Sequence, residues 1–298
     1  MRSAIERIAP AGQAAGINRR HARHRVRVVA VTGGKGGIGK SNVSLNLSVA
    51  LADRGQNVLL LDADLGLANI DVLLGLRPKR TLAHVFDGTA TLDEVIVEGP
   101  CGIRIIPGAS GVYQMAQLTN LEHAGFIHAF GELGEDLDTL IVDTAAGISD
   151  TVLSFARASQ ELLVVVCDEP ASLTDAYALI KIMNREHGRR RFRVLCNMCR
   201  SSEEGRGLFS KLSRVCEQYL DVVLEFAGAI PYDERLRKAV QMQRAVVDAF
   251  PAAPAAQAFK KLAQAADNWP VVGHASGRIE FFVEQLIQSG RVVEESQA

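Results

Sequence analysis

Residues 26–42 read VRVVAVTGGKGGIGKSN, and this stretch decides the fold class of the chain. β-Prone residues lead directly into a glycine-rich loop that ends in Gly39-Lys40-Ser41, and a helix-compatible segment follows at once. Strand, glycine loop and helix in this order are the context that a GxxxxGK[ST] phosphate-binding loop needs. Glycines let successive backbone N–H groups converge on an anion, and the helix adds the positive end of its dipole. The sequence therefore predicts that the chain binds a nucleoside triphosphate.

The loop residues have distinct chemical tasks. We expect Lys40 to reach the β- and γ-phosphates and the Ser41 hydroxyl to bind Mg²⁺. Lys35 is unusual, because it places a second lysine inside the loop. A subunit gains little from two lysines on its own phosphates, so Lys35 is predicted to act on the nucleotide of a partner subunit. The predicted nucleotide-binding loop consists of Gly34, Lys35, Gly36, Gly37, Ile38, Gly39, Lys40, Ser41 and Asn42.

Composition is typical of a soluble cytosolic enzyme. In 298 residues, 33 lysines and arginines nearly balance 34 aspartates and glutamates, so no global charge dictates attachment to nucleic acid or membrane. Five cysteines and no recognisable signal segment favour reduced thiols. Cys196 and Cys199 form a CxxC pair, but a second pair is missing, which disfavours a zinc site.

Apolar runs alternate with amphipathic segments along the chain. Near-continuous apolar strands separated by helices indicate a doubly wound α/β fold, with a mostly parallel sheet of about seven to eight strands covered on both faces. The predicted strands are Val26–Val31, Val58–Leu61, Ile103–Ile106, Leu140–Val142, Leu162–Val166, Phe192–Leu195 and Val222–Ile230. The predicted helical segments include Leu121–Leu133, Ala171–Glu186, Arg206–Tyr219 and Ala255–Ala266.

Aspartates follow two of these strands, at the sheet edge where ligands of such folds bind. The segment LLLDADLGLANID carries Asp62 and Asp64, and LIVDTAAG carries Asp143. Asp143 stands in the position of a Walker B carboxylate and is predicted to hold Mg²⁺ through water, with Asp62 in support. Asp64 could orient the water that attacks the γ-phosphate. The alternative is that these aspartates are helix caps or loop acids.

The KGGxGK[ST] loop resembles the deviant phosphate loop of the MinD/ParA family of ATPases. This resemblance implies a slow, regulatory ATPase in which the first lysine bridges two subunits around two ATP molecules. It also implies that the second aspartate of the D-x-D segment serves hydrolysis, and that Gly147 lies in the turn that senses the γ-phosphate. The implied catalytic residues are Lys35, Lys40, Asp64 and Asp143, and the implied metal ligands are Ser41, Asp62 and Asp143.

The same resemblance suggests where the base is held. Asn197 would meet the adenine ring, and Pro231, Tyr232 and Asp233 would flank it. Glu169 would lie near the dimer face and is counted among the nucleotide-binding residues. A turn-forming asparagine is the plain alternative for Asn197.

Longer segments of the sequence resemble, more specifically, the FlhG/FleN group of flagellar-number regulators, and this similarity spans residues 26–287. They include DADLGLANIDVLLG and the segment CDEPASLTDAYALIK. What this implies is an ATP-dependent homodimeric switch that binds and inhibits a flagellar master transcription activator of the FleQ/FlrA type. It would also oppose the polar GTPase FlhF. The implied location is the cytoplasm, with peripheral association to the inner face of the cell membrane near a pole.

The ends of the chain differ from this core. We divide it into an N-terminal tail (1–25), an ATPase domain (26–269), a linker (270–277) and a C-terminal helix and tail (278–298). Within the tail, residues 12–19 are similar to the DQAxxLR activation helix of FlhG proteins, with substitutions that weaken the match. The C-terminal helix is amphipathic and is predicted to bind either the membrane or a groove of its own body. Its apolar residues are Ile279, Phe281, Phe282, Val283, Leu286 and Ile287.

Other functions on the same core remain open at this stage. They are a ParA-like partitioning ATPase for DNA or cargo and a MinD-like regulator of the cell-division site. The DNA function needs a basic surface, and only residues 19–27 and 189–193 are locally basic. An iron–sulfur reductase would need a cysteine just after Asp143, where this chain has Thr144.

Overall fold

The computed structural model describes residues 25–64, 69–108, 120–269 and 279–297, so the tail segment 1–24 and the linker 270–277 lie outside the described residues. One sheet of eight strands runs through this part of the chain, in the order β3-β4-β2-β5-β1-β6-β7-β8. Adjacent strands are parallel except β3, which pairs antiparallel with β4. The strands are β1 (Arg27–Thr32), β2 (Val58–Ala63), β3 (Val97–Glu98), β4 (Arg104–Ile106), β5 (Thr139–Thr144), β6 (Glu161–Val166), β7 (Arg191–Cys199) and β8 (Val223–Pro231).

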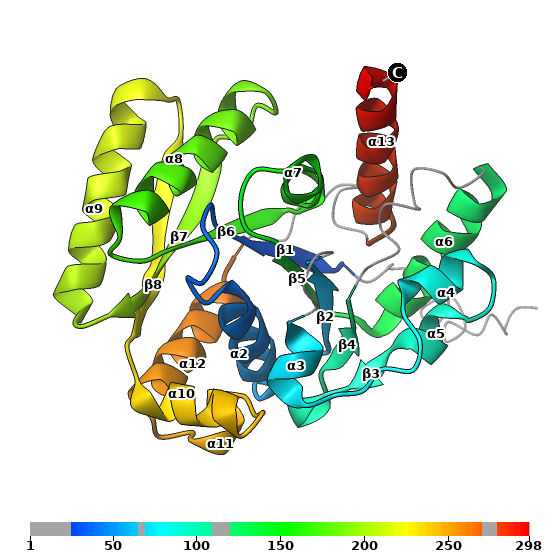
Figure 1. Ribbon diagram of the computed structural model, residues 1–298, viewed down its shortest axis with the longest axis horizontal. Coiled ribbons are helices and arrows are strands. Elements are labelled where there is room, and N and C mark those ends of the chain that lie inside the picture. Colours follow the sequence, from blue (N-terminus) through cyan, green and yellow to red (C-terminus); the bar gives the residue numbers. More distant parts are fainter. Residues whose placement is uncertain (1–24, 65–68, 109–119, 270–278, 298) are drawn as a thin grey trace, which may run out of the picture.

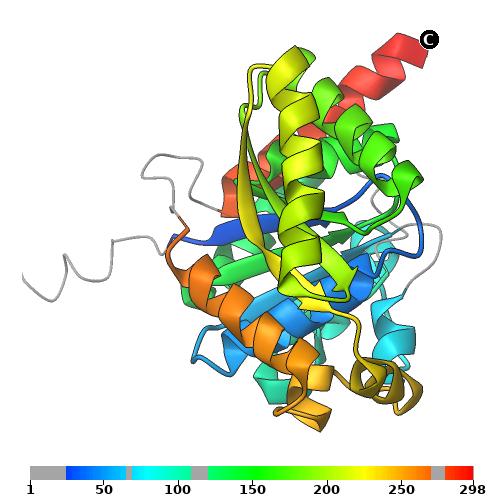
Figure 2. The same cartoon turned by 90° about the vertical axis from the view of Figure 1, so that its left-hand side faces the viewer.

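Helices cover both faces of the sheet (Figure 1). One face packs against α2 (Lys40–Ala52), α3 (Ile70–Leu74), α10 (Glu234–Gln241), α11 (Val246–Ala249) and α12 (Pro254–Asp267). The other packs against α4 (Leu82–Phe86), α5 (Leu92–Val95), α6 (Asn120–Leu133), α7 (Asp150–Ala158), α8 (Pro170–Arg185), α9 (Ser202–Tyr219) and α13 (Ile279–Gln297). The turned view separates α12 from α9, which lie on opposite sides of the strands (Figure 2).

The inner strands are buried along their whole length, as their apolar sequences require. Strands β1, β2, β5 and β6 contain no residue outside the buried class. Their side chains alternate between the two apolar clusters, so Val28 faces one cluster and Val29 the other. This explains why the sequence shows continuous apolar runs rather than an alternation of apolar and polar residues.

The doubly wound, mostly parallel fold is confirmed. Each predicted strand occurs, and the predicted helical segments correspond to α6, α8, α9 and α12. The short strand β3 and the short helices α3, α4, α5, α7, α10 and α11 were not predicted. These elements are too short for a hydrophobic period to stand out from the surrounding loop sequence.

Helix α13 lies against the body of the protein, as the second of the two predictions for this helix expects. Ile279, Phe282, Val283, Leu286 and Ile287 are buried, while Phe281 is half-buried. The helix packs on α7 and α6, and the rings of Phe282 and Phe155 lie 6.4 Å apart between centroids. A Cβ at Gly134 would come within 2.6 Å of Ile279, so glycine at this position allows the close approach.

Candidate nucleotide-binding site

The predicted phosphate loop joins the carboxyl end of β1 to the start of α2. Gly37 and Gly39 adopt left-handed backbone angles, with φ of 79° and 84°, which glycine adopts without steric cost. Gly39 is the N-cap residue of α2, so the first free N–H groups of that helix border the loop. Gly34 packs directly against the backbone of Asp175 in α8, where any side chain would clash. The loop is therefore shaped by its neighbours as well as by its glycines.

Lys40 lies inside this loop rather than on its surface. Its side chain is 8% exposed, and Nζ donates to the carbonyl oxygen of Lys35 at 3.3 Å. Burial lowers the pKa of Lys40, and the carboxylates of Asp143 and Asp64 act in the opposite direction. A buried ammonium aimed across a loop of backbone N–H groups is arranged to receive an anion.

Asp143 provides the complementary negative group. It is fully buried, and Oδ1 accepts a hydrogen bond from Ser44 at 2.7 Å. Burial raises the pKa of Asp143 to about 7, against a hydrogen bond from Ser41 that lowers it. The second oxygen, Oδ2, has no hydrogen-bond partner among the described residues. An unpartnered buried carboxylate oxygen beside a serine hydroxyl fits Mg²⁺, which prefers oxygen ligands.

Asp62 lies beside Asp143 but has a different set of partners. The two residues are paired in the register of β2 and β5. Asp62 accepts backbone N–H groups from Asp64, Asn69 and Ile70, at 3.0 to 3.1 Å. Burial raises the pKa of Asp62 to about 6, and these N–H groups oppose the rise. The carboxylate therefore connects the start of α3 to the end of β2 through hydrogen bonds. This is the helix-capping role that the sequence offered as the alternative to metal binding.

Asp64 is half-buried at the open side of the phosphate loop, which we call the mouth. The Nδ2 atom of Asn69 lies 3.4 Å from Oδ2 of Asp64. The turn after Asp143 lies at the same mouth. Gly147, with φ of 98°, donates its N–H to the carbonyl oxygen of Gly33 at 3.2 Å. One backbone hydrogen bond thus connects this turn to the phosphate loop. The structure brings Lys40, Asp64, Asp143 and Gly147 together, while their catalytic roles stay predictions.

The side chain of Lys35 has a partner outside the phosphate loop in the single chain. It forms an ion pair with Glu169, the N-cap residue of α8, and both side chains are exposed to solvent. The hydrogen bond to Glu169 raises the pKa of Lys35. The ion pair keeps Lys35 at the surface beside the loop, where a partner subunit could reach it.

A cavity of about 420 Å³ opens beside the loop and gathers the residues predicted to hold the base. Asn197 is buried, and its Nδ2 donates to the carbonyl oxygen of Ile38 at 2.8 Å. Asp233 accepts N–H groups from Arg235 and Ala255, so it also caps neighbouring helices. The lining consists of Gly39, Asn42, Asn197, Met198, Pro231, Tyr232, Asp233, Leu236, Arg237 and Phe259.

An irregularity in β7 shapes this cavity. The pairing of β7 with β8 shifts between Cys196 and Cys199, so β7 carries one extra residue there. Met198 takes the left-handed conformation, with φ of 58°, and is 45% exposed. Such a bulge re-aims side chains beside a site. It places Asn197 inward against the loop and Met198 on the rim of the cavity.

Five residues of the site were missed by the sequence reasoning. Ser44 follows Ser41 by one helical turn, a spacing that places both hydroxyls on one face of α2 and could have indicated it. Met198, Leu236, Arg237 and Phe259 line the cavity. Because their positions depend on a bulge in β7 and on the packing of α10 and α12, no local pattern identifies them.

The described residues contain neither a preformed metal-binding cluster nor a membrane-spanning helix. They contain no group of three or more histidine, cysteine, aspartate or glutamate side chains placed to hold a metal ion. A Mg²⁺ ion here would take further ligands from the nucleotide and water. In the same part of the chain, no helix combines the length and apolarity needed to cross a bilayer.

Comparison with known proteins agrees with this site. The family model for the CobQ/CobB/MinD/ParA nucleotide binding domain matches residues 29–246. The septum site-determining protein MinD of Pyrococcus horikoshii, solved with Mg-ADP, superposes with a TM-score of 0.64 at 26% identity, over 82% of this chain and 96% of that one. The fold and site thus define a phosphate-loop ATPase of the MinD/ParA class, which uses ATP and Mg²⁺.

Two curated relatives narrow the assignment. The antiactivator FleN of Pseudomonas aeruginosa is 60% identical over 265 residues, which cover 89% of this chain and 95% of the relative. The flagellum site-determining protein YlxH of Helicobacter pylori is 36% identical over 220 residues, which cover 73% and 74%. The chain belongs to the FlhG/FleN group of the MinD/ParA family.

Proposed function

We propose that the chain is an ATP-gated dimerising switch that controls flagellar number as an antiactivator. One observation carries the proposal. The phosphate loop holds two lysines in different environments, with Lys40 buried inside the loop and Lys35 exposed at the surface. Lys40 serves the chain's own triphosphate, and Lys35 serves the triphosphate of a second copy.

The chemistry follows from the geometry of the mouth. Lys40 and the N–H groups of the loop and α2 bind the phosphates, while Ser41 and Asp143 hold the metal ion. When bound there, Mg²⁺ would neutralise part of the negative charge of the triphosphate. Asp64 orients the attacking water, and Asp62 holds the backbone on either side of Asp64 in place. Hydrolysis then removes the phosphate that both subunits share and releases the pair.

Exposed apolar side chains around the mouth support a face-to-face dimer. Ile148, Met198 and Tyr232 are 43%, 45% and 54% exposed, although each is large and apolar or aromatic. Ile148 follows the turn that contains Gly147, and the other two residues border the base cavity. A second copy that covers this mouth would remove these side chains from water.

The dimer is tested by size-exclusion chromatography with light scattering, in ADP and in a non-hydrolysable ATP analogue. We expect a monomer with ADP and a dimer with the analogue. Lys35→Ala should bind the analogue and stay monomeric, whereas Lys40→Ala should fail to bind it. Asp64→Ala should bind ATP, stop turnover and stay dimeric. A Lys35→Ala protein that dimerises like the wild type would refute the role in trans.

The cellular partners are proposed from the relatives. Because a 60% identical relative bears the name antiactivator, we infer that this chain binds and inhibits a flagellar master transcription activator of the FleQ/FlrA type. It would oppose the polar GTPase FlhF. Mixing the purified activator with the wild-type chain should lower the activator's ATPase rate. The same measurement with Lys35→Ala, which we expect to stay monomeric, tests whether this inhibition requires the dimer.

The division of the chain is part of the same proposal. It consists of an N-terminal tail (1–25), an ATPase domain (26–269), a linker (270–277) and a C-terminal helix and tail (278–298). A peptide that spans residues 1–25 should raise GTP hydrolysis by FlhF if residues 12–19 still act as an activation segment. An unchanged GTP hydrolysis rate ends that part of the proposal and leaves the ATPase switch intact.

We further propose that α13 associates with the inner face of the cell membrane when it leaves its docking site. An amphipathic helix with an apolar face suits the lipid interface, and two such helices in a dimer bind more strongly than one. ATP should increase sedimentation with anionic liposomes, and deletion of residues 277–298 should abolish it. Sedimentation that is equal in ADP and ATP would contradict nucleotide control.

A further inference from the structure

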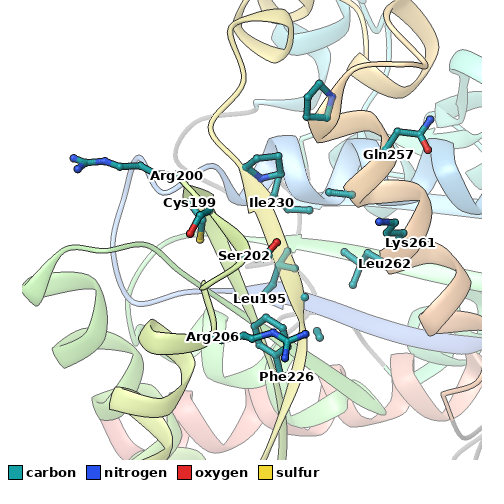
Figure 3. Close-up of a pocket in the computed structure, with 17 residues that line it drawn as sticks. Leu195, Cys199, Arg200, Ser202, Arg206, Phe226, Ile230, Gln257, Lys261 and Leu262 are labelled. Atoms are coloured by element: carbon teal, nitrogen blue, oxygen red, sulfur yellow. The ribbon is translucent and has the colours of Figure 1, made fainter. Parts of the chain in front are cut away.

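A second hollow lies along β8, between α9 on one face of the sheet and α12 on the other (Figure 3). Its volume is about 580 Å³, and it opens to solvent beside the edge strand. Leu195, Phe226, Ile230 and Leu262 give it an apolar lining. We call this hollow the edge groove. Of the predicted nucleotide-binding residues, Pro231 alone lines it, at the end of β8, and no residue of the phosphate loop does.

Strand β8 offers unpaired backbone to this groove. It is the last strand of the sheet and, within the described residues, pairs with β7 alone. Its nine residues read VLEFAGAIP, and most are only partly buried. The single charged residue, Glu225, turns inward to Arg193 and Arg191. Edge strands are usually protected by outward charges, so an apolar edge of this length is a candidate for pairing with another strand.

The edge groove is also one-sided in charge. Arg206 of α9 and Lys261 of α12 lie on either side of β8, and Arg200 lies at one end (Figure 3). Among the described residues that line the groove, none carries a carboxylate. An occupant with acidic side chains would gain from both flanks.

We propose that the edge groove binds an extended, acidic segment of a partner protein, which adds to the sheet as a strand beside β8. An extended segment satisfies the free N–H and C=O groups of the edge, whereas a helix would leave them unpaired. Its apolar side chains would pack on Phe226 and Leu262, and its acidic side chains would face Arg206 and Lys261. A second copy of this chain does not fit, because its own β8 edge carries the same cations.

The probe is a fluorescein-labelled peptide built from repeated Glu-Glu-Val-Val units and about seven residues long, near the usual strand length. Because successive side chains of a strand point to opposite faces, this repeat places both acidic and apolar side chains on each face of the added strand. It is titrated into the full chain without nucleotide and followed by fluorescence anisotropy. We expect this peptide to bind, while a lysine–valine peptide and a glutamate–valine peptide interrupted by proline do not. Hydrogen exchange should slow at residues 223–231 when the acidic peptide is present.

Variants then locate the site. Arg206→Glu with Lys261→Glu should weaken the acidic peptide by about tenfold or more, since like charges replace opposite ones. Arg214→Glu is the matched control, because Arg214 is exposed on the same helix but does not line the groove. ATP binding and the circular dichroism melt should be the same in both variants as in the wild type.

Four outcomes would overturn the proposal. They are no binding of the acidic peptide, equal binding by the double variant, protection from exchange outside β8, and stronger binding of duplex DNA that competes with the peptide. Self-association through β8 would also count against it. None of these results bears on Lys35 or the phosphate site, so the ATP switch is judged separately.

Discussion

Buried charges lie at both ends of the sheet, and the two ends treat them differently. At the amino ends of the strands, Arg193 donates to Glu161 at 2.7 Å and to Glu225 at 2.5 Å, and its guanidinium stacks on Trp269 at 4.4 Å. At the carboxyl ends, Lys40 has one carbonyl partner, and one oxygen of Asp143 has none within the described residues. In the first set both carboxylates pair with Arg193, although its Nη2 has no hydrogen-bond partner within the described residues, and these ion pairs stabilise the fold. The second set, Lys40 and Asp143, leaves polar groups available to a bound nucleotide and metal ion.

The largest effect is expected when Arg193 is removed from its buried ion pairs. Arg193→Met leaves the carboxylate of Glu161 buried without its main partner and should lower the free energy of unfolding by about 3–5 kcal/mol. Urea denaturation measures this change. The double variant Glu161→Gln with Arg193→Met should recover part of the loss, and the affinity of either folded protein for ATP should be unchanged.

Lys40→Ala tests the opposite end. It removes the ammonium group that binds the phosphates, so the variant should lose affinity for ATP, and phosphate release at a fixed ATP concentration should fall by about 10²–10³-fold or more. Because the lysine is only partly satisfied without nucleotide, the melting temperature of the nucleotide-free protein should not fall. Phosphate release and calorimetry check the two statements. A strongly destabilised protein would mean that Lys40 is structural like Arg193.

A pH series on Asp143→Asn sharpens the contrast further. Because the pKa of Asp143 rises from 3.8 to about 7 on folding, the folded state binds more protons than the unfolded state between these values. The stability of the nucleotide-free wild type should therefore fall as the pH rises through this window. Near pH 4 the variant should match the wild type, and near pH 8 it should be more stable by about 4 kcal/mol, since a pKa difference of one unit corresponds to about 1.4 kcal/mol. Chemical denaturation at each pH measures the difference.

The smallest effect is expected at the exposed pair Lys35–Glu169. Since both side chains reach solvent, Glu169→Gln should leave the free energy of unfolding unchanged within error. The dimer with an ATP analogue should persist, because Lys35 supplies the contact in trans. Loss of that dimer in Glu169→Gln would show that Glu169 itself contributes to the interface.

The sequence predicts most of this architecture because its signals are local. The strands β1, β2, β5 and β6 are unbroken apolar runs, and the glycines of the phosphate loop stand between a strand and a helix. Parallel strands whose carboxyl ends meet at one edge bring Asp62 and Asp143 into register. These features follow from spacing alone.

The remaining features depend on contacts between distant segments. The partners of Asp62 are N–H groups at Asn69 and Ile70, which only the return of the chain supplies. The position of Met198 depends on a bulge between β7 and β8. Arg193 reads as part of a basic run but is buried in an ion pair. A single sequence contains no local signal for such pairings.

The docking of α13 sets a condition on how it can leave. Its buried side chains Ile279, Phe282, Val283, Leu286 and Ile287 would all meet water on release. At roughly 1.5–3 kcal/mol for each, the exposure would cost on the order of 7–15 kcal/mol. Thermal fluctuation alone would populate such a state in a vanishing fraction of molecules. Undocking therefore has to be an exchange, in which another apolar surface receives the helix as the body lets it go.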